Sequence, residues 1–152
     1  MSRVPYIAVI GPGRASPEEL QVAEEVGARL AALGAVVVTG GLGGVMEAAS
    51  RGARSRRGRT VGILPGNDRD AANGWVEIAL ATGLGELRNG LVVRAVDAVV
   101  AIGGGHGTLS EIGLALRIGR PVVGVGTWEV HGVEQVSTPA TAIERIEAVL
   151  RA

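Results

Sequence analysis

The sequence of 152 residues contains no cysteine, no lysine and no phenylalanine. Without cysteine, the chain has no disulfide bond, no thiolate nucleophile and no zinc–cysteine site. Without lysine, it forms neither the Schiff base of pyridoxal phosphate enzymes nor the lysine contact of a Walker A phosphate loop. Because one tyrosine and two tryptophans are the only aromatic residues, the core must consist of valine, isoleucine, leucine and alanine.

The sequence also lacks net charge and long apolar runs. Fifteen arginines balance fifteen acidic residues, whereas a dedicated nucleic-acid-binding protein usually has a strong basic excess. There is no 18-residue apolar stretch and no charged start followed by a long apolar run, so we expect neither a membrane span nor a targeting segment. We therefore expect a single domain over residues 1–152, in a cytoplasmic protein that binds neither nucleic acid nor membranes.

Short apolar runs alternate with amphipathic segments along the chain. Strands are expected at 6–10, 35–39, 60–64, 75–80, 97–102 and 121–125, and helices at about 16–33, 45–53, 86–96, 108–118 and 139–150. This alternation predicts an α/β fold, a single Rossmann-like doubly wound parallel sheet with helices on both faces. Ligands bind such sheets beyond the carboxyl ends of the strands.

Glycine-rich segments at 11–13, 40–44 and 103–107 each follow a predicted strand. Backbone N–H groups at a helix start attract anions, so these segments predict a phosphate site. A mononucleotide or another phosphate ester is favoured over a dinucleotide, because GPGRAS departs from G-x-G-x-x-G and no acid follows the second strand. The candidate phosphate- or nucleotide-binding residues are Gly11, Gly13, Gly41, Gly43, Gly44, Gly104, Gly105, His106, Gly107 and Thr108.

The two histidines give only weak evidence for a binding role. His106 could donate a hydrogen bond to a phosphate, or it could occupy a tolerant loop position. With His131 isolated elsewhere, the two histidines do not form a metal site, and no metal is expected.

Glu111 and Arg88 are the candidate catalytic residues. A carboxylate at the start of a helix can activate water or stabilise positive charge. Glu111 also completes a capping box with Thr108, in which it would only accept a hydrogen bond from the backbone. Arg88 lies near the predicted start of a helix, where its charge opposes the helix dipole, which suggests a phosphate or carboxylate partner.

The arginines at the end of the second predicted helix permit two interpretations. They suit a solvated helix end, or they form a patch for phosphate or a partner. These residues are Arg51, Arg54, Arg56, Arg57 and Arg59.

Three segments together resemble a known family. TGGLGGVMEAAS, at 39–50, is similar to a first glycine-rich motif, and GGHGTLSE, at 104–111, matches P-G-G-x-G-T-x-x-E from its second residue. Arg88-Asn89 falls where that family has an Arg-Lys pair. The chain thus resembles the Lonely Guy family of phosphoribohydrolases, and within that superfamily a short branch that includes molybdenum cofactor carrier proteins.

The resemblance implies a reaction and a set of roles. The family hydrolyses the N-glycosidic bond of a nucleoside 5′-monophosphate, such as AMP or a cytokinin riboside monophosphate, to free base and ribose 5-phosphate. Arg88 and Glu111 take the catalytic positions, no cofactor is implied, and a homodimer or higher homo-oligomer is expected. The implied phosphate-binding positions are Gly104, Gly105, Gly107 and Thr108.

Two departures imply an alternative. Gly103 replaces the motif proline and Asn89 replaces the family lysine, and both changes are associated with the carrier-like branch. That branch implies a non-catalytic protein that binds or carries molybdenum cofactor, a phosphorylated pterin, or another phosphorylated ligand. Glu111 and Arg88 favour catalysis only slightly, since capping alone could explain the glutamate.

Overall fold

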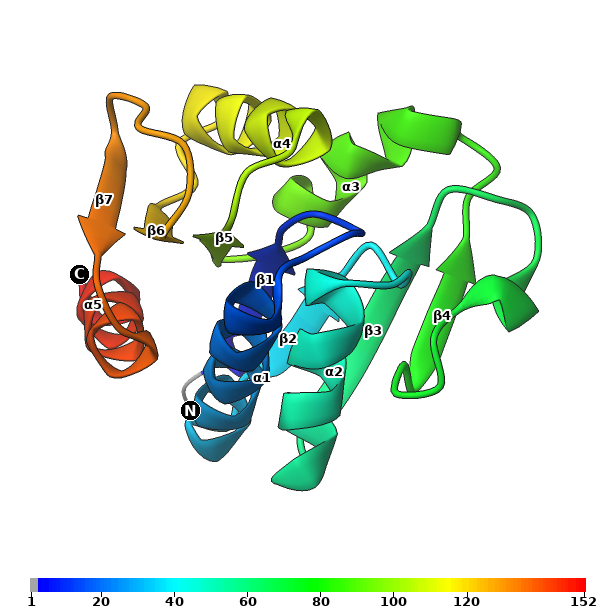
Figure 1. Ribbon diagram of the computed structural model, residues 1–152, viewed down its shortest axis with the longest axis horizontal. Helices are drawn as coiled ribbons and strands as arrows, with labels where there is room; N and C mark the ends of the chain where they lie inside the picture. The colour runs from blue at the N-terminus through cyan, green and yellow to red at the C-terminus, as the bar shows by residue number, and fades with distance from the viewer. Residues whose placement is uncertain (1–2) are drawn as a thin grey trace.

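The computed structural model describes residues 3–152, in which strands and helices alternate (Figure 1). The strands are β1 (Tyr6–Ile10), β2 (Val36–Thr39), β3 (Arg59–Leu64), β4 (Ile78–Ala81), β5 (Ala98–Ile102), β6 (Val122–Val125) and β7 (Val133–Val136). The α-helices are α1 (Pro17–Ala32), α2 (Val45–Ser55), α3 (Asn89–Arg94), α4 (His106–Arg117) and α5 (Pro139–Arg151). Two short 3-10 helices are η1 (Arg69–Ala71) and η2 (Gly85–Arg88).

The seven strands form one parallel sheet in the order β4-β3-β2-β1-β5-β6-β7. The predicted α/β fold with a Rossmann-like, doubly wound parallel sheet is therefore confirmed. The chain builds outward from β1 to β4 and then returns to place β5 on the other side of β1. Such a reversal leaves a crevice at the carboxyl ends of the two central strands.

Helices cover both faces of the sheet, with α1, α2 and α5 on one face and α3 and α4 on the other (Figure 1). Residues of β1 alternate between the two cores: Ile7 and Val9 pack toward the first group of helices, and Ala8 and Ile10 toward the second. Because β1 and β5 are buried on both faces, their sequences are continuous apolar runs, as parallel central strands require.

Helix α1 begins as its sequence predicts. Ser16 accepts a hydrogen bond from the Glu19 backbone at 3.1 Å, and the Glu19 side chain accepts one from the Ser16 backbone at 2.9 Å. This reciprocal capping box, with Pro17 in the first turn, satisfies the amides at this end with the helix's own side chains.

Helices α1 and α2 cross at two glycines. A Cβ atom at Gly27 would lie 2.0 Å from the carbonyl oxygen of Ala49, and one at Gly52 would lie 1.9 Å from that of Glu24. Glycine within a helix costs about 1 kcal/mol relative to alanine. At these two positions any side chain would force the backbones apart, so the cost is offset by close packing.

The segment between β4 and β5 differs from its prediction. Instead of one helix over 86–96, η2 ends at Arg88 and α3 spans only Asn89–Arg94. Gly85 has a φ of +61°, and Gly90 further weakens the helical preference. The helix ends before Asp97 because the Asp97 amide donates to the Tyr6 carbonyl at 2.8 Å, at the start of the pairing with β1.

Two strands also differ from their predictions. β7 was not expected, because the four residues VEQV at the sheet edge are too few for a periodic signal. β4 starts at Ile78 and not at Trp75, whose carbonyl accepts a hydrogen bond from the Thr60 hydroxyl at 2.7 Å.

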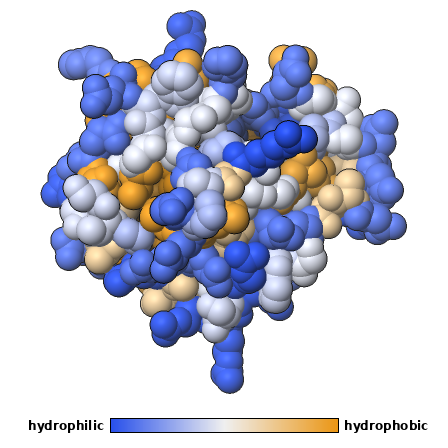
Figure 2. All heavy atoms as spheres, in the orientation of Figure 1, coloured by the Kyte–Doolittle hydropathy of each residue, from blue (hydrophilic) through white to orange (hydrophobic). Residues whose placement is uncertain are grey.

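Hydrophilic residues dominate the face shown in Figure 2, and apolar residues show only between them. Three of the arginines in and after α2 form ion pairs: Arg51 of α2 with Glu24 at 3.2 Å, and both Arg54 of α2 and Arg59 at the start of β3 with Glu77, at 3.2 and 2.9 Å. These pairs support the interpretation as a solvated helix end.

Within residues 3–152, no helix combines the length and apolar character needed to cross a membrane.

Candidate functional site

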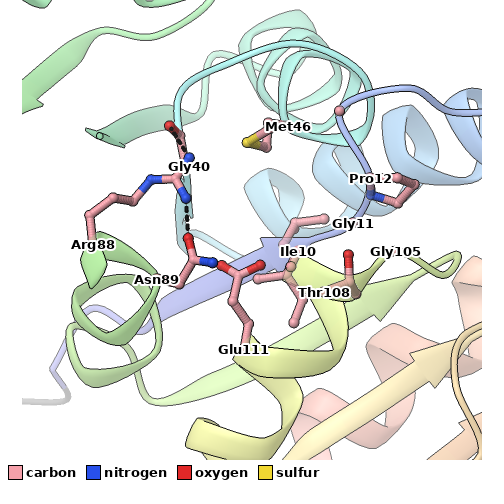
Figure 3. Close-up of a pocket in the computed structure, with 13 residues that line it drawn as sticks. Ile10, Gly11, Pro12, Gly40, Met46, Arg88, Asn89, Gly105, Thr108 and Glu111 are labelled. Carbon is pink, nitrogen blue, oxygen red and sulfur yellow. Dashed lines mark hydrogen bonds between the residues drawn. The ribbon is translucent and has the colours of Figure 1, made fainter. Parts of the chain in front are cut away.

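A cavity of about 260 Å³ opens at the crevice between the carboxyl ends of β1 and β5 (Figure 3). Its walls come from the segments that follow β1, β2 and β5, together with the η2–α3 junction. It is lined by Val9, Ile10, Gly11, Pro12, Gly13, Gly40, Met46, Arg88, Asn89, Gly105, Gly107, Thr108 and Glu111. The structure thus brings the two candidate catalytic residues together with four of the predicted glycines and Thr108.

The first turn of α4 forms one wall of the cavity. Its N-cap is Gly105, which offers no side chain to the helix, and the first helical bond is from the Leu109 amide to the Gly105 carbonyl at 2.9 Å. The amides of His106, Gly107 and Thr108 therefore have no partner within the helix. Whereas the start of α1 is closed by its own capping box, the start of α4 is open to an anion.

The capping-box interpretation of Glu111 is wrong. Helix α4 begins at His106, two residues earlier than predicted, so Thr108 lies within the first turn and is not the N-cap. Glu111 lies farther along the helix, and its side chain reaches into the cavity (Figure 3). A role in capping therefore does not explain this glutamate.

Glu111 is an unusual acid because it is only 8% exposed. Burial raises its pKa from the ordinary 4.5 to about 7, although the positive charge of Arg88 acts in the opposite direction. Near neutral pH the group therefore exchanges readily between its protonated and ionised forms.

Arg88 is buried and held by backbone carbonyls. Its Nε donates to Ile63 at 2.8 Å, one terminal nitrogen donates to Gly40 at 3.3 Å, and the other donates to the side chain of Asn89. Burial lowers the pKa of Arg88, and Glu111 partly offsets this shift. Since Ile63 and Gly40 lie at the ends of β3 and β2, the sheet itself fixes the guanidinium at the cavity wall.

Asn89 lies between the two charged residues in Figure 3. Its amide oxygen accepts from Arg88, and its amide nitrogen faces the carboxyl group of Glu111. The family lysine would add a second positive charge at this buried position, whereas asparagine links the two groups without one. With an uncharged residue at position 89, the positive charge that acts on Glu111 is that of Arg88.

The remaining predicted glycines have different surroundings. A Cβ at Gly13 would be in ordinary contact with the Met46 side chain at 3.9 Å, whereas a Cβ at Gly11 would lie 2.6 Å from both the Ile102 carbonyl and the Val45 side chain. Three others do not line the cavity: Gly41, Gly43 and Gly44 shape the turn into α2.

Gly104 and His106 also lie outside the cavity lining, on the side of the loop that faces Trp128. The neighbouring Gly103 explains the missing motif proline. Its φ is +69°, a left-handed value that the proline ring cannot adopt. The change from the family motif thus follows from the backbone conformation of this loop.

Four lining residues that contribute to the site were not predicted as site residues: Pro12, Gly40, Met46 and Asn89. Pro12 and Gly40 fall within the predicted glycine-rich segments 11–13 and 40–44, Asn89 is a departure from the family pair, and Met46 is expected simply to pack. Gly40 matters because it supplies a carbonyl to Arg88 and because a Cβ there would lie 2.5 Å from the guanidinium.

The site therefore combines an open helix N-terminus, a fixed cation and a titratable acid. This set suits a small phosphorylated ligand whose other end carries hydrogen-bond donors or develops positive charge. Among residues 3–152, no cluster of three histidine, aspartate or glutamate side chains could hold a metal ion.

Comparisons with known proteins cover most of the described chain. The model of the SLOG cluster4 family matches residues 4–150. An uncharacterised protein from Archaeoglobus fulgidus is 41% identical over 138 residues, which cover 90% of this chain and 91% of that protein.

Two solved structures share both fold and sequence with this chain. The molybdenum cofactor binding protein from the phototrophic bacterium Rippkaea orientalis has a TM-score of 0.93 and 38% identity, with 99% of each chain covered. The molybdenum cofactor carrier protein MCP from Chlamydomonas reinhardtii has a TM-score of 0.92 and 34% identity, with 99% of this chain and 100% of that chain covered.

Proposed function

Because the chain belongs to the SLOG cluster4 family, a short branch of the Lonely Guy superfamily, we propose that it binds and carries molybdenum cofactor or a closely related phosphorylated pterin. The observation that carries this proposal is its full-length likeness to the two molybdenum cofactor proteins. Gly103 and Asn89, the two departures from the hydrolase motif that are associated with the carrier-like branch, agree with this proposal. Gly103 has a positive φ, and Asn89 accepts a hydrogen bond from Arg88.

The cavity offers complementary groups to such a ligand. The free amides of the first turn of α4 bind the phosphate, and Arg88 contributes the opposite charge. The carboxyl group of Glu111 accepts hydrogen bonds from the amino and ring N–H groups of a pterin. Because about 260 Å³ is below the usual ~300–1,000 Å³ of small-molecule pockets, part of the ligand protrudes from the cavity.

The test is to purify the protein from a bacterium that makes molybdenum cofactor. Molybdenum and the fluorescent oxidation product of the pterin are then measured per chain. We expect both to be retained at close to one per site, and to be lost in Gly105→Val, which places a side chain in the cavity. Background levels of both in the wild-type protein would rule the proposal out.

A second candidate is the phosphoribohydrolase activity, and the observation that favours it is the placement of Arg88 and Glu111 at one cavity. Cleavage of an N-glycosidic bond develops positive charge on the sugar, which an ionised Glu111 can stabilise while it guides the attacking water. With a pKa of about 7, a large fraction of Glu111 is ionised at neutral pH.

This candidate is tested by incubating the protein with AMP and cytokinin riboside monophosphates and measuring free base by chromatography. Glu111→Gln should abolish release while the fold persists. If no nucleoside monophosphate in a broad panel yields free base, the hydrolase activity is excluded and only the carrier function remains as a proposal.

We also propose that the protein forms a homo-oligomer through an exposed leucine stripe, defined as Leu84, Leu87 and Leu91. Leu84 is the residue before η2, Leu87 lies in η2 and Leu91 in α3, and Leu87 is 75% exposed. An apolar surface of this kind is costly in water and marks an interaction site. Since Arg88 is in the same segment, a second copy placed there would lie beside the cavity.

The cytoplasmic location and the absence of nucleic-acid binding stay predictions.

A further inference from the structure

Two side chains from the segment after β6 contact the glycine loop before α4. The Thr127 hydroxyl donates to the Gly103 carbonyl at 2.6 Å, and the Trp128 indole nitrogen donates to the Gly105 carbonyl at 3.0 Å. The indole also covers Gly104, where a Cβ would lie 3.6 Å away. Neither Thr127 nor Trp128 lines the cavity, so they act on the loop from its outer side.

These two bonds also determine where the loop amides point. In a trans peptide the C=O and the following N–H lie in one plane and point in opposite directions. All peptide bonds among the described residues are trans. With the Gly103 and Gly105 carbonyls directed at Thr127 and Trp128, the amides of Gly104 and His106 point away from Trp128.

Trp128 is itself anchored on two sides. Its carbonyl accepts a hydrogen bond from the Gln135 side chain on β7 at 2.8 Å. Its ring stacks on His106, with centroids 6.3 Å apart and planes inclined by 20°. The outermost strand of the sheet is thus connected, through Trp128, to the first residue of α4. This connection also accounts for His106, which contacts the tryptophan and does not line the cavity.

We propose that Thr127 and Trp128 are positioning residues that hold the glycine loop in its anion-binding conformation before any ligand arrives. The proposal rests on the proposed function, because it concerns the same phosphate seat. The seven positions from Gly103 to Leu109 include four glycines. If the Thr127 and Trp128 bonds did not order this backbone, it would lose conformational entropy when a phosphate bound. A loop ordered in advance binds the anion without that loss.

The test uses the full-length protein labelled with ¹⁵N and two conservative variants. Trp128→Phe keeps the ring and removes the indole N–H, and Thr127→Val keeps the shape and removes the hydroxyl. Backbone order parameters of Gly104 and His106 are measured without ligand, and inorganic phosphate is then titrated into the same samples. We expect lower order parameters in both variants and phosphate binding weakened by about 2- to 10-fold, as for the loss of one hydrogen bond.

Matched controls separate this effect from a general loss of stability. Trp75→Phe changes a tryptophan of similar exposure, 43% against 36% for Trp128. Ser55→Ala removes an equivalent hydroxyl-to-carbonyl bond, from Ser55 to Gly52 at 2.6 Å, outside the cavity lining. Both controls should retain the wild-type order parameters and phosphate affinity.

The outcomes distinguish this proposal from the proposed function. If both variants keep wild-type order parameters, or become disordered yet bind phosphate as tightly as the wild type, the positioning role is overturned. If phosphate shifts no loop amide of the wild-type protein, the anion seat and the proposed function are overturned. In that case the order parameters still decide whether Thr127 and Trp128 order the loop.

Discussion

Arg88 and Glu111 line one cavity with Asn89 between them, and the charge of each opposes the pKa shift that burial imposes on the other. Arg88 is tied to the carbonyls of Ile63 and Gly40, so the guanidinium is fixed relative to the sheet. The two charged groups interact through space, because each affects the pKa of the other. Because burial is the larger effect on Glu111, its charge changes near neutral pH.

Replacing Glu111 by glutamine should change how stability depends on pH. The pKa of Glu111 is about 7 in the folded protein and near the ordinary 4.5 when unfolded. Between these values the folded state binds the extra proton, so the free energy of unfolding falls as pH rises. The free energy of unfolding keeps its full value below pH 4.5. By about pH 7 it has lost the contribution of the Glu111 proton, which is on the order of 3 kcal/mol.

Glu111→Gln removes this titration. Relative to the wild type, the variant should gain stability at pH 8 and differ little at pH 4.5. Urea unfolding at several pH values measures the difference. A stability difference that is the same at pH 4.5 and pH 8 would contradict the raised pKa.

Replacing Arg88 by glutamine should raise the pKa of Glu111 above 7, because the positive charge that lowers it is gone. The change also leaves the Ile63 carbonyl without its donor, at a cost of about 1–3 kcal/mol in stability. Carbon-13 NMR of the glutamate carboxyl groups measures the titration. Arg94→Gln is the matched control, since Arg94 is exposed and outside the cavity, and it should leave the Glu111 titration in place.

Two glycine-to-alanine changes should separate folding from binding. At Gly11 the new Cβ would lie 2.6 Å from a backbone carbonyl and from Val45, so Gly11→Ala should destabilise the fold by about 1–3 kcal/mol. At Gly105 its nearest neighbours would be Pro12 and Thr108 at 3.7 and 3.9 Å. Gly105→Ala should therefore fold with a loss below about 1 kcal/mol, yet bind phosphorylated ligands more weakly, because the methyl group enters the cavity.

Thermal unfolding and calorimetric titration of the two variants distinguish these effects. Equal losses of stability, or full ligand affinity in Gly105→Ala, would argue against Gly105 as part of the binding surface.

Replacing Leu87 by glutamate should dissociate the proposed homo-oligomer, because a charge at the centre of the leucine stripe would be buried in the interface. Sedimentation or light scattering across a concentration range measures the assembly. Val4→Glu is the control, since Val4 is 53% exposed and lies outside the stripe. A wild-type protein that is monomeric throughout that range would refute the assembly itself.

The fold was largely predictable because its strands are short apolar runs that alternate with helical segments. Ser16 and Glu19 predict the start of α1 from local chemistry alone, and the structure confirms that start. The start of α4 could not be found this way, since Gly105 has no side chain to mark it. The Thr108–Glu111 spacing therefore suggested a capping box in the wrong place.

The site was only partly predictable for a different reason. The glycines of the loop before α4 share one segment with Glu111, whereas the carbonyl groups that hold Arg88 belong to β3 and to the residue that follows β2. Contacts of this kind depend on the order of strands in the sheet, which the local sequence does not specify. The bonds from Thr127 and Trp128 to the loop likewise join residues that are far apart in sequence, by 24 and 23 positions.

The glycine crossing of α1 and α2 has a mechanical consequence for the cavity. With Gly27 and Gly52 in backbone contact, the two helices cannot slide or tilt past each other without a steric clash. They therefore behave as one rigid plate, and the wall formed by Gly11, Pro12 and Met46 moves only with that plate. Any adjustment to ligands of different size must come from the part of the lining that lies outside this plate.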